Sequence, residues 1–129
     1  KLQENCPNVE VFGPVSDMRE VYCRTKIVLA PSQWDEAWGR IATEAHFSGI
    51  PVLASDAGGL PESVGPGGVL VPRDAPIEKW CEALSGIWDN ISWFEDLSKK
   101  ALDFSKRSEI ESLNILARLD IRIERVVFG

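Results

Sequence analysis

Residues 26–55 read KIVLAPSQWDEAWGRIATEAHFSGIPVLAS, and this stretch decides the fold class. It contains two short apolar runs, at 27–30 and 52–55, and neither run alternates apolar with polar residues. Uninterrupted apolar strands are typical of parallel sheets that have helices on both faces. Between the runs, residues from about 38 to 47 have helical spacing and are followed by Gly49, which suits the left-handed residue after a helix. The stretch therefore predicts a strand, a helix and a second strand.

The same alternation continues on both sides of this stretch. Residues 9–12 and 69–72 are two further apolar runs beside glycine and proline, so we expect strands there. A short helix is predicted over 17–24, with Ser16 or Asp17 as its N-cap. Alternating strands and helices predict the α/β class, with a Rossmann-like parallel sheet and helices on both faces, over a βα core of about 9–72.

After residue 72 the pattern is helical only, which predicts a helical tail over about 76–127. Its first helix should begin near Ile77, and two capping-box patterns predict further helices over 93–106, opened at Ser92, and 109–127. Four strands followed by three helices would make a lopsided doubly wound domain. We therefore expect residues 1–129 to be one partial domain that lacks its first βα units.

Composition excludes several classes of function. The chain has 129 residues, with 20 acidic against 14 basic side chains and a net charge of -6, so a nucleic-acid partner is not expected. The three cysteines have no metal-type spacing, which indicates reduced, packed thiols in a cytoplasmic protein. No apolar run reaches the roughly 18 residues that a membrane span needs. His46, the one histidine, is expected to be packed or solvated and not to act as a base.

Glu36 and Glu44 stand eight positions apart around the predicted helix. On one continuous helix they would be about 12 Å apart along the axis and roughly 80° apart around it, so they could not share a proton or a metal ion. Glycosidase carboxylate pairs stand closer, at about 5 to 9.5 Å. Glu36 should precede the helix, at the carboxyl end of a strand, which is where ligands bind to open α/β sheets.

The start of the helix offers unpaired N–H groups between the two glutamates. Such groups suit an anion such as a phosphate, and Gly39 leaves room for a ligand to approach the backbone. Carboxylates on both sides of a donor-rich helix start match a nucleotide sugar, with hydroxyls at both ends and phosphates in the middle. The spacing alone leaves another interpretation open, because a glutamate early in a helix favours the helix dipole and one in mid-helix is usually solvated.

Four segments together resemble the donor-binding half of the retaining glycosyltransferases of family 4. They are residues 31–45, 49–55, 58–62 and 67–71, within a similarity that runs from about 9 to 72. These enzymes have the GT-B architecture of two Rossmann-like domains. Their E-x7-E motif matches Glu36 and Glu44, with Trp38 where the family usually has phenylalanine before a glycine.

The resemblance implies a role for each matching residue. Glu36 would be the catalytic glutamate, contacting the sugar hydroxyls near the anomeric face. Glu44 would bind the ribose of the nucleotide. Other donor contacts would come from the backbone, at Trp38, Gly39, Arg40 and Ile41 for the sugar and diphosphate and at Val15 for the base.

The resemblance also implies the reaction. A glycosyl group would move with retention from a nucleotide sugar, UDP- or GDP-linked, to an acceptor hydroxyl, without a metal or other cofactor. The family's basic pair and its N-terminal acceptor-binding domain have no counterpart in this sequence, so the chain alone is expected to be inactive. Membrane association of the full-length enzyme is left open. The alternative is a non-catalytic nucleotide-sugar-binding module of the same fold.

Overall fold

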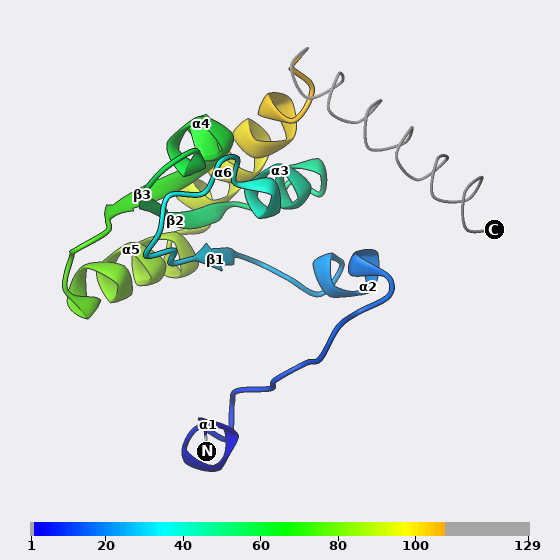
Figure 1. The fold of residues 1–129 in the computed structure, drawn as a ribbon. Helices are drawn as coiled ribbons and strands as arrows, with labels where there is room; N and C mark the ends of the chain where they lie inside the picture. The colour runs from blue at the N-terminus through cyan, green and yellow to red at the C-terminus, as the bar shows by residue number, and fades with distance from the viewer. Residues whose placement is uncertain (1, 108–129) are drawn as a thin grey trace.

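The computed structural model describes residues 2–107. Two short helices precede the sheet (Figure 1). The elements follow in the order α1 (Leu2–Asn5), α2 (Met18–Tyr22), β1 (Val28–Ala30), α3 (Arg40–Phe47), β2 (Val52–Asp56), α4 (Leu60–Val64), the 3-10 turn η1 (Gly65–Gly67), β3 (Gly68–Pro72), α5 (Ile77–Asp89) and α6 (Ile91–Phe104). The three strands and the helix predicted between the first two therefore form within two residues of their expected bounds.

The strands form one parallel sheet in the order β1-β2-β3. Val28 pairs with Val52 and Val52 pairs with Gly68, so all three strands begin at the same level. Their carboxyl ends consequently meet at one edge of the sheet, and the loops that follow them are neighbours.

Helices cover both faces of this sheet, as the uninterrupted apolar runs predict. The first face packs under α3 and α4, and its buried cluster comprises Val28, Ala30, Ala42, Ala45, Ile50, Val52, Ala54, Leu60 and Val64. On the opposite face, beside α5, Leu53 is fully buried while Leu29 is 47% exposed. Helix α6 packs against η1 and α3 (Figure 1). The α/β class with helices on both faces is confirmed.

Two of the expected helix ends are correct and one is wrong. Asp17 caps α2 by accepting a hydrogen bond from the Arg19 N–H, and Gly49 has a φ of 65° after α3. Helix α6, however, begins two residues before the predicted position. Its cap is Asn90, whose side chain accepts from the Trp93 N–H at 3.0 Å, so Ser92 lies inside the helix.

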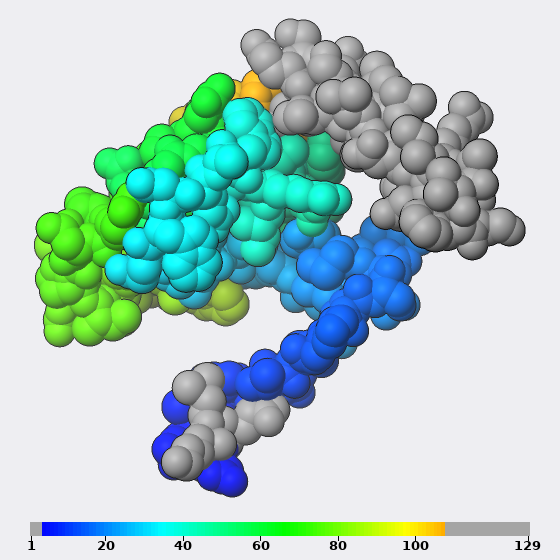
Figure 2. All heavy atoms as spheres, viewed as in Figure 1, coloured from blue at the N-terminus to red at the C-terminus, as the bar shows by residue number. Residues whose placement is uncertain are grey.

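The strand expected at 9–12 does not form. A strand is stabilised by hydrogen bonds to a neighbouring strand, and within residues 2–107 this segment has none. Val11 and Phe12 are instead 64% and 66% exposed, on a stretch that extends away from the sheet between α1 and α2 (Figures 1 and 2). The helix expected over 109–127 lies outside the described residues.

His46 is fully buried between α3 and η1, as the packing interpretation predicts. Its Nε2 lies 2.9 Å from the Val64 carbonyl oxygen and its Nδ1 lies 3.3 Å from that of Ile50. Burial lowers the pKa of His46 below its ordinary value, although both carbonyls act in the opposite direction. The side chain therefore links α3 to Val64, the last residue of α4, and its burial favours the neutral form.

The surface differs from expectation at the cysteines. All three thiols are free, but Cys23 and Cys81 are exposed and not packed as expected. Cys23 follows α2 as its C-cap residue, and Cys81 lies on α5 among the residues that line a cavity against the sheet. Among residues 2–107, no helix combines the length and the apolar character that a membrane crossing needs.

Candidate functional site

Three loops meet at the carboxyl edge of the sheet, one after each strand. The loop after β1 contains Glu36, and its carbonyl oxygen accepts a hydrogen bond of 2.6 Å from the Gly59 N–H, in the loop after β2. Asp35 forms an ion pair with Arg73, in the loop after β3. The E-x7-E segment is thus fixed from both neighbouring loops, at the edge where α/β proteins bind ligands.

Glu36 lies in the loop before α3, as the sequence predicts, and its carboxylate is held in place. The buried Ser32 hydroxyl donates a hydrogen bond to its Oε1. The Glu36 side chain is half-buried, and within residues 2–107 its Oε2 has no hydrogen-bond partner. One carboxylate oxygen is therefore fixed and the other is free to accept a hydroxyl from a ligand.

Gly58 and Gly59 pack directly against the backbone of Glu36 and Ala37. Gly58 has a φ of 52°, in the left-handed region, and a Cβ there would lie 2.5 Å from both the N and the O of Glu36. A Cβ on Gly59 would lie 2.5 Å from the carbonyl oxygen of Ala37. Both positions need glycine because the two loops touch through their backbones.

Glu44 lies in the middle of α3, and two side chains hold its carboxylate. The Tyr22 hydroxyl of α2 donates to Oε2 at 2.9 Å, and the Arg40 Nε donates to Oε1 at 2.7 Å. The Glu44 side chain is 33% exposed. It is neither buried without a partner nor simply solvated, so its conformation is defined before any ligand arrives.

The start of α3 corrects one expectation about the helix-start N–H groups and shows a packing role for Gly39. The Arg40 N–H donates to the Trp38 carbonyl, so it is not a free donor. Within residues 2–107, the N–H groups of Trp38, Gly39 and Ile41 have no acceptor. Gly39 is itself buried, and a Cβ there would collide with Leu60 of α4. Its lack of a side chain allows α3 to approach α4, which is a different role from leaving room for a ligand.

Side chains around the motif have partners of their own. The Trp38 indole Nε1 donates to the Thr43 hydroxyl at 3.1 Å, which fixes the loop to the helix. Val15 lines a cavity of about 300 Å³ beside α2, together with Phe12 and Val21. It lies on the stretch that precedes α2, and no hydrogen bond places it against Glu36 or Glu44.

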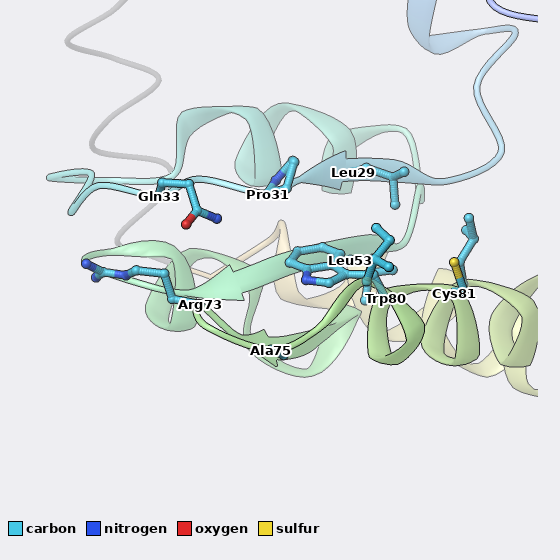
Figure 3. A pocket seen from close by; sticks show the side chains of 10 residues that line it. Leu29, Pro31, Gln33, Leu53, Arg73, Ala75, Trp80 and Cys81 are labelled. Atoms are coloured by element: carbon cyan, nitrogen blue, oxygen red, sulfur yellow. The ribbon is translucent and has the colours of Figure 1, made fainter. Parts of the chain in front are cut away.

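An apolar cavity of about 400 Å³ lies on the α5 face of the sheet near the same edge. In Figure 3, Leu29, Pro31 and Gln33 lie along one side, opposite Arg73, Ala75 and Trp80 of the loop after β3 and α5. The glutamates of the motif do not line this cavity. Its walls are mainly hydrocarbon, so it differs chemically from the polar edge that contains Glu36.

Comparison with known proteins shows the family and agrees with this fold. The family described as Glycosyl transferases group 1 matches residues 1–90, which include the whole sheet and the E-x7-E segment. The chain belongs to this family. The chain is 36% identical over 96 residues to the D-inositol 3-phosphate glycosyltransferase of Corynebacterium kroppenstedtii, covering 73% of the chain and 21% of that protein. It is also 36% identical over 119 residues to the Corynebacterium glutamicum enzyme of that name, covering 88% and 28%. It therefore spans about a quarter of these relatives.

Solved structures show the same GT-B fold. A glycosyltransferase from Rickettsia africae superposes with a TM-score of 0.69 at 22% identity, covering 99% of this chain and 35% of that one. The Anabaena protein Alr3699/HepE, solved in complex with UDP and glucose, gives a TM-score of 0.68 at 21% identity, covering 84% and 30%. The sheet and its helices therefore correspond to part of a GT-B domain.

Three site residues were not among those predicted from the sequence. Ser32 stands four positions before Glu36, where a local hydrogen bond is possible, so its spacing carried a usable signal. Tyr22 and Arg73 reach the motif from other loops and helices, across 22 and 38 positions respectively. Residues this far apart share no repeating sequence pattern, so only the folded sheet shows that they are neighbours.

Proposed function

We propose that this chain forms the donor-binding part of a retaining glycosyltransferase. The enzyme would move a glycosyl group from a UDP- or GDP-linked sugar to an acceptor hydroxyl. One observation supports this most strongly: Glu36 and Glu44 are each held by a hydroxyl donor, on either side of a helix start that has free N–H groups. Such an arrangement suits a ligand with hydroxyls at both ends and a diphosphate between them.

Each group has a distinct task in this proposal. The free Oε2 of Glu36 accepts a hydroxyl of the donor sugar, near the carbon that reacts. Glu44 accepts hydroxyls of the ribose. The unpaired N–H groups of Trp38, Gly39 and Ile41 face the diphosphate, whose negative charge increases as the bond to the sugar breaks, so they stabilise the leaving group.

The proposal includes no metal ion at the donor site. Among residues 2–107, no group of three or more His, Cys, Asp or Glu side chains is arranged to hold one. The UDP bound to the Anabaena relative supports a uridine nucleotide as the first candidate. Addition of EDTA should leave nucleotide affinity unchanged, and a loss of affinity that Mg²⁺ restores would contradict this part of the proposal.

Two alanine variants test the assignment of the glutamates. Isothermal titration of the full-length protein with UDP-glucose, GDP-mannose and the free diphosphates should first identify the nucleotide. Glu44→Ala should then weaken the diphosphate and the sugar nucleotide alike. Glu36→Ala should weaken the sugar nucleotide only, because its carboxylate contacts the sugar.

Glu95→Ala is a matched control, since Glu95 is exposed on α6 and has no hydrogen-bond or ionic partner within residues 2–107. It should leave both affinities as they are. Equal losses for both ligands in both site variants would contradict the separate roles of Glu36 and Glu44. Where the full-length protein transfers sugar, NMR of the product anomer tests retention, and binding without transfer would favour a non-catalytic module.

A further inference from the structure

The Glu44 carboxylate is held by two donors of unequal rigidity. Tyr22 contacts one oxygen and Arg40 contacts the other, so together they define the plane of the carboxylate. The Arg40 side chain is 82% exposed and is four residues away on the same helix. Exposed pairs of this kind contribute little and are weakened by salt.

Tyr22 is the rigid member of this pair. Its ring packs against the buried cluster between the sheet and α3, and its hydroxyl reaches Glu44 from a separate helix. Burial, with the hydrogen bond to Glu44 as the second cause, raises the pKa of Tyr22 to about 12. The phenol consequently stays protonated and remains a donor across the neutral range.

The two donors leave acceptor capacity on the carboxylate. An ionised carboxylate has about four acceptor positions, and Tyr22 and Arg40 use one on each oxygen. A third of the side chain is exposed, so it is open in part to solvent and to a ligand. One free position on each oxygen matches two neighbouring hydroxyls, as found on the 2′ and 3′ carbons of ribose.

We propose that Tyr22 is a positioning residue, which fixes Glu44 so that both of its oxygens accept the vicinal hydroxyls of a ribose. This inference rests on the proposed function, because it requires a nucleotide at Glu44. It goes beyond that function because it makes a contact between α2 and α3 responsible for selecting ribose over a deoxygenated sugar. A carboxylate that accepts two hydroxyls can select ribose over a deoxygenated sugar only while the plane of the carboxylate is fixed. The hydrogen bond from Tyr22 fixes that plane.

The test uses the full-length protein and two probes, UDP and 2′,3′-dideoxy-UDP, measured by isothermal titration at low salt. Tyr22→Phe keeps the packed ring and deletes only the hydroxyl. It should weaken UDP roughly 3- to 10-fold, the range for one lost hydrogen bond, and leave dideoxy-UDP unchanged. In a Glu44→Ala background, Tyr22→Phe should have no further effect on UDP.

Thr25→Val is the matched control. Thr25 follows α2, and its hydroxyl donates to the Val21 carbonyl at 2.7 Å without reaching Glu44. This variant also removes one hydroxyl from the same segment, so it should leave both affinities unchanged. Thermal melts of each variant would show whether the segment remains folded.

The outcomes separate this inference from the proposed function. If Glu44→Ala weakens UDP but Tyr22→Phe does not, the donor site stands and the positioning role is wrong. If Tyr22→Phe weakens UDP and dideoxy-UDP equally, Tyr22 acts through the fold of α2 and the inference fails. If the wild-type protein binds no nucleotide, or Glu44→Ala leaves UDP affinity intact, the nucleotide role of Glu44 and the inference fail together.

Discussion

Replacing Gly58 with alanine should damage the candidate site without removing a side chain of the proposed donor site. Gly58 has a φ of 52° and packs directly against the Glu36 backbone. An added Cβ would lie 2.5 Å from the Glu36 N and O, about 0.9 Å closer than ordinary contact allows. Both atoms belong to the backbone, so the loop itself must move.

The magnitude follows from two contributions. The left-handed conformation costs an alanine roughly 1–2 kcal/mol relative to glycine. Moving the loop also breaks the 2.6 Å hydrogen bond from the Gly59 N–H to the Glu36 carbonyl, which contributes about 1 kcal/mol. We expect Gly58→Ala to lower the free energy of unfolding by about 2–3 kcal/mol, and the shift of Glu36 to weaken the sugar nucleotide more than the diphosphate.

Urea unfolding, followed by tryptophan fluorescence, measures the first effect, and calorimetric titration measures the second. Gly13→Ala is the control, because nothing lies within 4 Å of a Cβ at that position and its φ is not positive. It should change stability by less than about 0.5 kcal/mol. Equal stability of the two variants would show that the Gly58 loop does not press against Glu36, and would refute this reasoning.

Three further changes have defined outcomes. Ser32→Ala removes the donor to Glu36 Oε1, so titration should show severalfold weaker binding of the sugar nucleotide and unchanged binding of the diphosphate. Gly39→Ala forces α3 away from α4 and should lower the free energy of unfolding by about 1–3 kcal/mol in urea. Burial lowers the pKa of His46 in the folded state below its ordinary value of 6.5. The stability that the buried imidazole contributes to the fold is therefore fully present above pH 6.5 and is lost as the pH falls through the folded-state pKa. His46→Gln should therefore lose less stability than the wild type between pH 7.5 and 5.5, as measured by thermal melts.

Much of the fold could be predicted because its signals are local. The runs 27–30 and 52–55 are continuous and apolar, so they indicated buried parallel strands, and Gly49 marked the end of the helix between them. Residues 9–12 are also mostly apolar, but composition does not show whether a neighbouring strand is present. Strand formation depends on that neighbour, and within residues 2–107 the segment has none.

Only the part of the candidate site that is continuous in the sequence could be predicted. The spacing of Glu36 and Glu44 and the helix between them are visible in the sequence. The packing of Gly39 against α4 was not predictable, because a glycine beside a helix start can serve either ligand approach or helix packing. The choice between them depends on Leu60, which lies 21 positions later and reaches Gly39 only through the α3–α4 contact.

The two glutamates differ in how the chain supports them, and this difference follows from topology. Glu36 is held by groups that follow strand ends, Ser32 after β1 and Gly59 after β2, so its position depends on the sheet. Glu44 is held by Tyr22, which precedes β1 and belongs to a helix outside the sheet. A motion of α2 would therefore move the Glu44 carboxylate while leaving Glu36 in place. In the proposed donor site, such a motion would change affinity for the nucleotide without any change at the sugar.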